Sequence, residues 1–235
     1  MFIWFFYYLC QHKEQKNHID VKLDQYEYFS DNNFENYFFY SNGPKGRIKK
    51  GITYTKFNDN PIIYNLAFGD FDPYTQHISD VVKSNNLDRD RVLATVANTI
   101  HEFSNHCGNP LIFATGSTPA RTRLYQISIA KLLDEILREF DIYGITNNLV
   151  SGFKKNVNYT AFLVKRKQTD TFNLTSKKGF IMPANKRSTI TYTKASVTEQ
   201  FRDYSNDSFV VGKVAKAKEI MSKVKLPDHL TSADL

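Results

Sequence analysis

The hydrophobic and polar positions alternate along the first third of the chain and follow a helical period further on. Apolar and aromatic residues dominate the stretches 37–40 and 62–72, and between them the stretch 46–57 alternates partly, with apolar residues at Ile48, Ile52, Tyr54 and Phe57. Strong turn signals separate them, Asn-Gly-Pro at 42–44 and Asn-Pro at 60–61. Because successive strands joined by short turns pair as a meander, the pattern predicts three neighbouring antiparallel strands.

Two helices and two further strands are expected after this meander. Acidic residues start a helix at Asp88, which has an apolar residue every three or four positions and ends near Gly108. The apolar run 110–114 predicts a buried strand, 120–140 has helical spacing, and 159–164 predicts a last strand. The order β-β-β-α-β-α-β predicts an α+β fold, in which two helices cover one face of an antiparallel-rich sheet.

The turn before the second helix is the most site-like feature of the sequence. Backbone N–H groups at a helix start lack intrahelical partners and carry partial positive charge, so they bind anions readily. Gly116, Ser117 and Thr118 form this turn, and Arg121 and Arg123 follow in the first helical turn. These five residues predict an anion-binding site. Residues two apart on a helix point roughly 200° apart, and we expect Arg121 to be the one that faces inward.

A structural role for the same arginines is the competing interpretation. Arg121 could pair with an internal carboxylate such as Asp70 or Asp72, which share one face of a strand. Catalytic residues are not identifiable, and Arg121 and Asp70 are the only candidates. His101 and His106 are five residues apart, so they do not match the H-E-x-x-H zinc motif. No metal site and no cofactor are expected.

Composition and charge restrict the class of protein. The chain has 235 residues, is 41% hydrophobic and carries a formal net charge of +7. Two distant cysteines, Cys10 and Cys107, suggest a reducing, cytoplasmic location without disulfides. No apolar run reaches the length of a membrane span. Residues 154–194 contain ten lysines and arginines but one acid, Asp170, so this segment is expected either to contact RNA or DNA phosphates or to be a solvated tail.

The composition changes along the chain and suggests four parts. Residues 1–25 form an apolar leader that is expected to be poorly ordered. Residues 26–168 form the α+β core domain. Residues 169–207 are rich in Thr, Ser, Asn and Lys and predict a basic flexible linker. Residues 208–235 begin with an amphipathic helix and form the tail.

The tail helix is expected to need a partner surface. Its apolar residues recur at helical spacing, at Val210, Val214, Ala217, Met221 and Val224. A lone helix of this length is marginal in water. We therefore expect the helix to pack on the core of its own chain or of a second copy. Self-association, or binding of a partner protein, through this helix is one consequence.

Four motifs carry a resemblance to a known domain family. They are GPKGRI at 43–48, YNLAFGD at 64–70, VLATV at 92–96 and FATGSTPARTRLY at 113–125. Over roughly residues 31–167, the chain resembles an uncharacterised bacterial family that is common in Bacteroidota and classed as a domain of unknown function. The resemblance implies no activity.

Three hypotheses about function remain open at this point. The first is the toxin-like half of a toxin–antitoxin module, which acts on RNA or a nucleotide and carries an antitoxin-like tail. The second is a non-enzymatic protein-interaction or nucleic-acid-binding domain with structural arginines. The third is a phosphoryl or nucleotidyl enzyme of metabolism. A phosphate-bearing ligand is the partner that the first and third hypotheses share.

Overall fold

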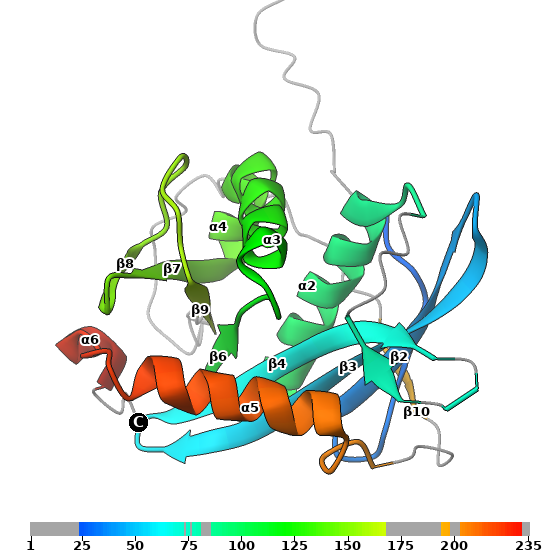
Figure 1. Ribbon diagram of the computed structural model, residues 1–235, viewed down its shortest axis with the longest axis horizontal. Helices are drawn as coiled ribbons and strands as arrows, with labels where there is room; N and C mark the ends of the chain where they lie inside the picture. The colour runs from blue at the N-terminus through cyan, green and yellow to red at the C-terminus, as the bar shows by residue number, and fades with distance from the viewer. Residues whose placement is uncertain are drawn as a thin grey trace, which may run out of the picture. The chain divides into compact units, whose positions relative to one another are not determined.

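The computed structural model describes residues 24–72, 74–75, 77–80, 86–167, 194–197 and 203–231 (Figure 1). The expected leader lies outside the described residues, apart from Asp24 and Gln25. Most of the expected basic linker also lies outside them. The division into leader, core, linker and tail therefore stays a prediction.

The predicted antiparallel meander is present and has one more strand than expected. It comprises β1 (Tyr28–Ser30), β2 (Asn36–Gly43), β3 (Gly46–Asp59) and β4 (Ile62–Phe71), each antiparallel to the next. β4 buries side chains on both of its faces. Both faces of the sheet must therefore be covered.

The other strands extend this meander into one large mixed sheet. They are β5 (Ile78–Ser79), β6 (Leu111–Ala114), β7 (Phe140–Thr146), β8 (Leu149–Gly152), β9 (Ala161–Arg166) and β10 (Ser196–Val197). The strand order is β10-β1-β2-β3-β4-β6-β9-β7-β8, and β5 also pairs with β4. Only β4 with β6 and β1 with β10 are parallel among the described strands. The α+β fold with a mostly antiparallel sheet is thus confirmed.

The segment expected as one helix over 120–140 is instead two short helices followed by a strand. α3 (Pro119–Lys131) and α4 (Leu133–Glu139) meet at Leu132, and β7 starts at Phe140. The hairpin of β7 and β8 was missed. Alternation of buried and half-buried residues begins at Phe140, and pairing with β9 decides in favour of the strand.

The two expected core helices lie on one face of the sheet (Figure 1). α2 (Arg89–His106) packs Val92, Val96 and Phe103 against aromatic residues such as Tyr54. α3 lies beside α2, and the Lys131 ammonium pairs with the Asp90 carboxylate between them.

The tail helix covers the opposite face of the sheet, as Figure 1 shows. α5 (Ser208–Met221) packs Val210 against Ala67 and Phe71 of β4. Ala217 of α5 packs with Ile63 of β4 in a second apolar cluster, which α6 (Asp228–Thr231) joins. The prediction that the tail helix packs on the core is therefore confirmed, and the core is that of its own chain. No helix in the described part of the chain is long and apolar enough to cross a membrane.

Candidate functional site

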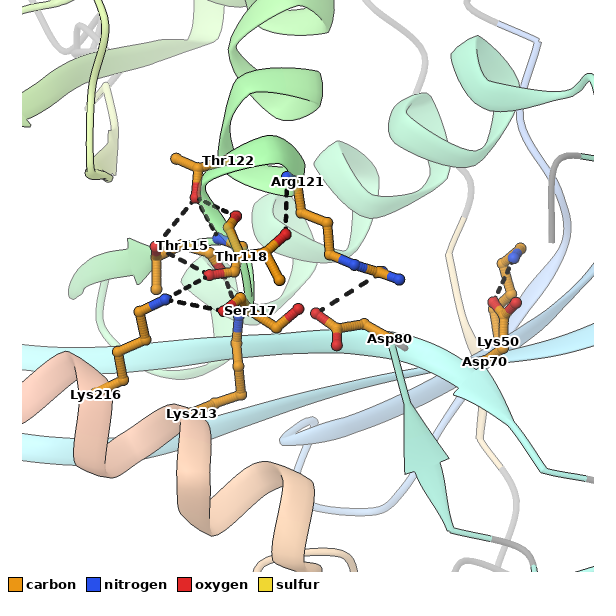
Figure 2. Close-up of polar contacts among 11 residues, drawn as sticks. Lys50, Asp70, Asp80, Thr115, Ser117, Thr118, Arg121, Thr122, Lys213 and Lys216 are labelled. Carbon is orange, nitrogen blue, oxygen red and sulfur yellow. Dashed lines mark hydrogen bonds and ion pairs between the residues drawn. The ribbon is translucent and has the colours of Figure 1, made fainter. Parts of the chain in front are cut away.

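The candidate site lies where one edge of β4 is shared by two strands. β6 pairs with Ile63–Asn65, and β5 pairs with Asp70–Phe71. Residues 66–69 lie between these two pairings. The chain leaves β6 at the start of this interval and forms the turn 115–118, which we call the α3 turn. Groups from both faces of the sheet can therefore reach the same turn (Figure 2).

Close packing and two threonines fix the shape of the α3 turn. A Cβ atom on Gly116 would overlap the backbone of Thr122 and the side chain of Arg121, so only glycine fits there. The Gly116 N–H donates to Thr122 Oγ1 at 3.0 Å. Thr118 is the N-cap and accepts from the Arg121 N–H at 3.3 Å, and Pro119 is the first helical residue.

Part of the anion-binding capacity predicted for the α3 turn is used internally. Because the Gly116 N–H is bonded to Thr122, it is not available to a ligand in this arrangement. In contrast, no described residue accepts a hydrogen bond from the backbone N–H of Ser117, Thr118 or Ala120. Ser117 is half-buried and the other two residues are exposed. The start of α3 therefore retains N–H groups that can bind an anion.

The two predicted arginines lie in different environments. The Arg121 side chain is 18% exposed, and its Nη1 atom lies 4.0 Å from Oδ2 of Asp80. Arg123 is exposed on the outer side of the same helix. Arg121 therefore faces the site and Arg123 faces solvent.

The two carboxylates expected near Arg121, Asp70 and Asp72, bind other groups in the structure. Asp70 pairs instead with Lys50 of the neighbouring strand at 2.5 Å, and both side chains are largely buried. Asp72 accepts hydrogen bonds from the N–H groups of Tyr74 and Thr75, so it caps its own turn. Asp80, which follows β5 directly, was not among the sequence candidates.

Two lysines of α5, which the sequence pattern did not predict, complete the site. Lys213 is 5% exposed and donates to the Thr115 carbonyl oxygen. Lys216 donates to the carbonyl oxygens of Gly116 at 2.9 Å and Ser117 at 3.2 Å. Figure 2 shows both side chains rising from α5 to the α3 turn.

A signal for Lys213 was present in the helical spacing of α5. The most buried positions of the helix are Val210, Lys213 and Ala217, whereas Val214 is only half-buried. Positions 210, 213 and 217 share one face of a helix. The buried face of α5 is therefore rotated slightly from the stripe expected through Val210, Val214 and Ala217, and this buried face includes Lys213.

The electrostatics of the site follow from burial and from mutual proximity. Burial lowers the pKa of Lys213 to about 8, the Asp80 carboxylate raises it in part, and Lys216 and Arg121 lower it further. Burial raises the pKa of Tyr125 to about 12, with a further increase from Asp80. Three cationic side chains and one carboxylate therefore lie around the α3 turn, and a phenol that stays protonated at neutral pH lies near them.

Other candidates of the sequence analysis do not form a site. Within the described ranges, no group of three or more His, Cys, Asp or Glu residues could hold a metal ion. His106 stacks on Phe34 at a centroid distance of 3.5 Å, and His101 contacts Asn105. Burial raises the pKa of the Cys107 thiol to about 11, which leaves it unreactive.

Comparison with known proteins identifies the domain that contains the α3 turn. A model described as "Family of unknown function (DUF6934)" matches residues 22–167. The chain belongs to the DUF6934 family. The resemblance to an uncharacterised domain family is confirmed. No curated protein and no solved structure matched the chain. The part matched to DUF6934 contains the α3 turn, Arg121 and Asp80, whereas Lys213 and Lys216 follow it.

Proposed function

We propose that this DUF6934 protein binds a phosphate-bearing ligand, a nucleotide or RNA, at the start of α3. The observation that carries the proposal is the convergence of Arg121, Lys213 and Lys216 on one turn, with Asp80 as the carboxylate among them. Phosphate is bound preferentially by helix N-termini and by arginine and lysine side chains. The remaining positive charge and the N–H groups of the α3 turn suit such a ligand.

The contact between Arg121 and Asp80 is compatible with ligand binding. A guanidinium has five N–H donors, so one arginine can hold a carboxylate and an anion at the same time. A nitrogen–oxygen distance of 4.0 Å is longer than a hydrogen bond, so this ion pair is loose. The proposal covers binding only. Asp70 has no part in it, because its carboxylate is held by Lys50.

A toxin-like activity on the bound RNA or nucleotide is a more specific version of this binding proposal. The lysines of α5 bond the α3 turn directly, so the tail helix covers part of the proposed site within its own chain. We propose that the core is toxin-like, acts on RNA or nucleotides, and is held inactive by α5 as an antitoxin-like cover. On this account, release of α5 in the full-length chain arrests growth. A non-enzymatic interaction domain with structural arginines is the alternative, and it predicts normal growth.

Isothermal titration calorimetry of the full-length chain with inorganic pyrophosphate tests the binding proposal. We expect saturable binding, which Arg121→Ala reduces about tenfold or more because a charge-assisted contact is lost. Arg123→Ala is the matched control on the same helix and should bind like the wild type.

The structural interpretation of Arg121 makes a different prediction for the same variants. If Arg121 serves only to neutralise Asp80, the wild type binds no pyrophosphate. Arg121→Ala then lowers the free energy of unfolding by about 3–5 kcal/mol, since a buried charge is left alone. That pair of results would refute the proposed function.

A further inference from the structure

Asp80 is a buried carboxylate with unused hydrogen-bonding capacity. The residue is 4% exposed, and neither Oδ1 nor Oδ2 accepts a hydrogen bond within the described part of the protein. Its recorded ion-pair partner is Arg121, at 4.0 Å. A buried acceptor without a donor is costly, so native proteins rarely leave both oxygens of a carboxylate unsatisfied. Figure 2 shows this carboxylate directed toward Arg121 and the α3 turn.

The surroundings of Asp80 favour a neutral donor over a metal ion. Arg121 lies beside the carboxylate, and Lys213 is close enough for Asp80 to raise its pKa. These two cations already balance the negative charge and would repel a divalent cation. Two free acceptor oxygens on one group match two donors on adjacent atoms of a ligand. A pair of neighbouring hydroxyl groups has this arrangement.

We propose that Asp80 binds the ribose hydroxyls of a ribonucleotide whose phosphate lies at the α3 turn. This inference rests on the proposed phosphate site and names the class of ligand that the site takes. Oδ2 of Asp80 and Nη1 of Arg121 lie 4.0 Å apart, so the groups that the two residues bind must be close together in the ligand. In a nucleotide the ribose is attached to the phosphate, whereas the base lies beyond it. The ribose therefore fits Asp80 better than the donor edge of guanine does.

Titration of the full-length chain with AMP, 2′-deoxy-AMP and inorganic pyrophosphate tests this inference. We expect AMP to bind about tenfold more tightly than 2′-deoxy-AMP, because one donor to a charged acceptor is lost. In Asp80→Ala this preference should fall to about one, while pyrophosphate still binds. Asp134→Ala, an exposed aspartate of α4, is the matched control and should keep the preference. Asp80→Asn replaces Asp80→Ala if the alanine variant does not fold.

The outcomes separate this inference from the proposed function. Equal affinity for AMP and 2′-deoxy-AMP, with pyrophosphate bound, overturns the ribose assignment and leaves the phosphate site intact. If GMP and 2′-deoxy-GMP bind with equal affinity and both bind more tightly than AMP, Asp80 binds the base edge, and the ribose assignment is overturned. Absence of pyrophosphate binding refutes the proposed function, and the ribose assignment with it.

Discussion

Lys213 occupies a position that a helix facing a sheet normally gives to an apolar side chain. It lies between Val210 and Ala217, both fully buried, and its ammonium reaches the Thr115 carbonyl. Burying a charge is costly unless it is paired and hydrogen-bonded, and here Asp80 and the carbonyl offset part of that cost. Local rules are often broken at functional sites, and this lysine is such a departure.

The lowered pKa of Lys213 predicts a pH dependence of stability. The pKa is about 8 in the folded protein against 10.5 in the unfolded chain. Between these values the unfolded chain holds more protons, so the free energy of unfolding rises as the pH rises. The contribution from Lys213 should grow by about 3 kcal/mol over this range. Below this range both states are protonated, so the pH dependence disappears and the full cost of burying the charged ammonium remains.

Urea unfolding of the wild type and of Lys213→Met from pH 7 to 10.5 measures this contribution. Subtracting the two profiles removes opposing effects, such as that of Cys107, whose raised pKa of about 11 lowers stability as the pH rises above 9. Lys218→Met is the control, since Lys218 is exposed on the same helix and is not among the groups that shift the pKa of Lys213, so its profile should follow the wild type. Parallel profiles for the wild type and Lys213→Met would show that Lys213 is not a buried cation.

The predictable residues of the site are those that local chemistry determines. Gly116, Thr118 and Pro119 have the types that a tight turn, an N-cap and a first helical position require, so the sequence indicates them. Asp80 and Lys213 come from elements far away along the chain. Asp80 meets the α3 turn because β5 and β6 share one edge of β4, and Lys213 meets it because α5 packs on the sheet. No local pattern reveals either arrangement.

At the scale of elements, α5 connects the tail to the core through apolar contacts and lysines together. Val210 and Ala217 belong to the apolar clusters on one face of the sheet, and Lys213 and Lys216 bond the α3 turn. Asp207 caps the helix through the Phe209 N–H and also contacts His77 at 2.8 Å. The helix therefore depends on the core at its start and along its buried side.

A charge at Ala217 should release α5 from the sheet. Ala217 is fully buried against Ile63 and Leu111, so Ala217→Asp places a carboxylate among apolar side chains without a partner. Because an isolated helix of this length is marginal, the amides of α5 should lose hydrogen-exchange protection while those of α2 and β3 retain theirs. Val211→Asp is the control, since Val211 is 50% exposed. Unchanged protection of α5 in Ala217→Asp would contradict this account of its docking.

The same pair of variants tests the toxin-like proposal. Cells that express full-length Ala217→Asp should arrest growth, whereas cells that express Val211→Asp should not. Normal growth with both variants, once release of α5 has been confirmed by hydrogen exchange, removes the toxin-like proposal. That result would leave the phosphate-binding proposal standing, because the pyrophosphate titration tests it independently.

The elements that the sequence predicts well are those with a strong local period. Apolar and polar residues alternate in β2, β3 and β4, which turn signals separate, and α2 has a clear apolar stripe. β7 is not predicted from the sequence, and its first residue, Phe140, falls at the end of the expected helix, because the strand character of β7 depends on pairing with β9. Gly144 lies in this strand, where the Tyr159 ring leaves no room for a side chain. The glycine reflects tertiary packing that the sequence alone does not reveal.

At the scale of the whole molecule, the described residues from Lys194 onward form one compact unit with residues 24–167. α2 and α3 cover one face of the sheet, and α5 covers the other (Figure 1). The site lies beside residues 66–69 of β4, between the pairings of this strand with β6 and with β5. The Arg121 side chain reaches it from one face of the sheet and the Lys213 side chain from the other. The matched family region therefore supplies the turn, and α5 supplies two of the cations around it.

Binding of phosphate at the α3 turn is the central claim, and an NMR titration tests it most directly. Full-length protein labelled with ¹⁵N is titrated with inorganic pyrophosphate. The account predicts saturable shifts of the backbone amides of Ser117, Thr118 and Ala120, together with the Lys213 side chain, because these groups would contact the anion. Shifts confined to exposed lysines elsewhere, or no saturable shift at the α3 turn, would contradict the claim.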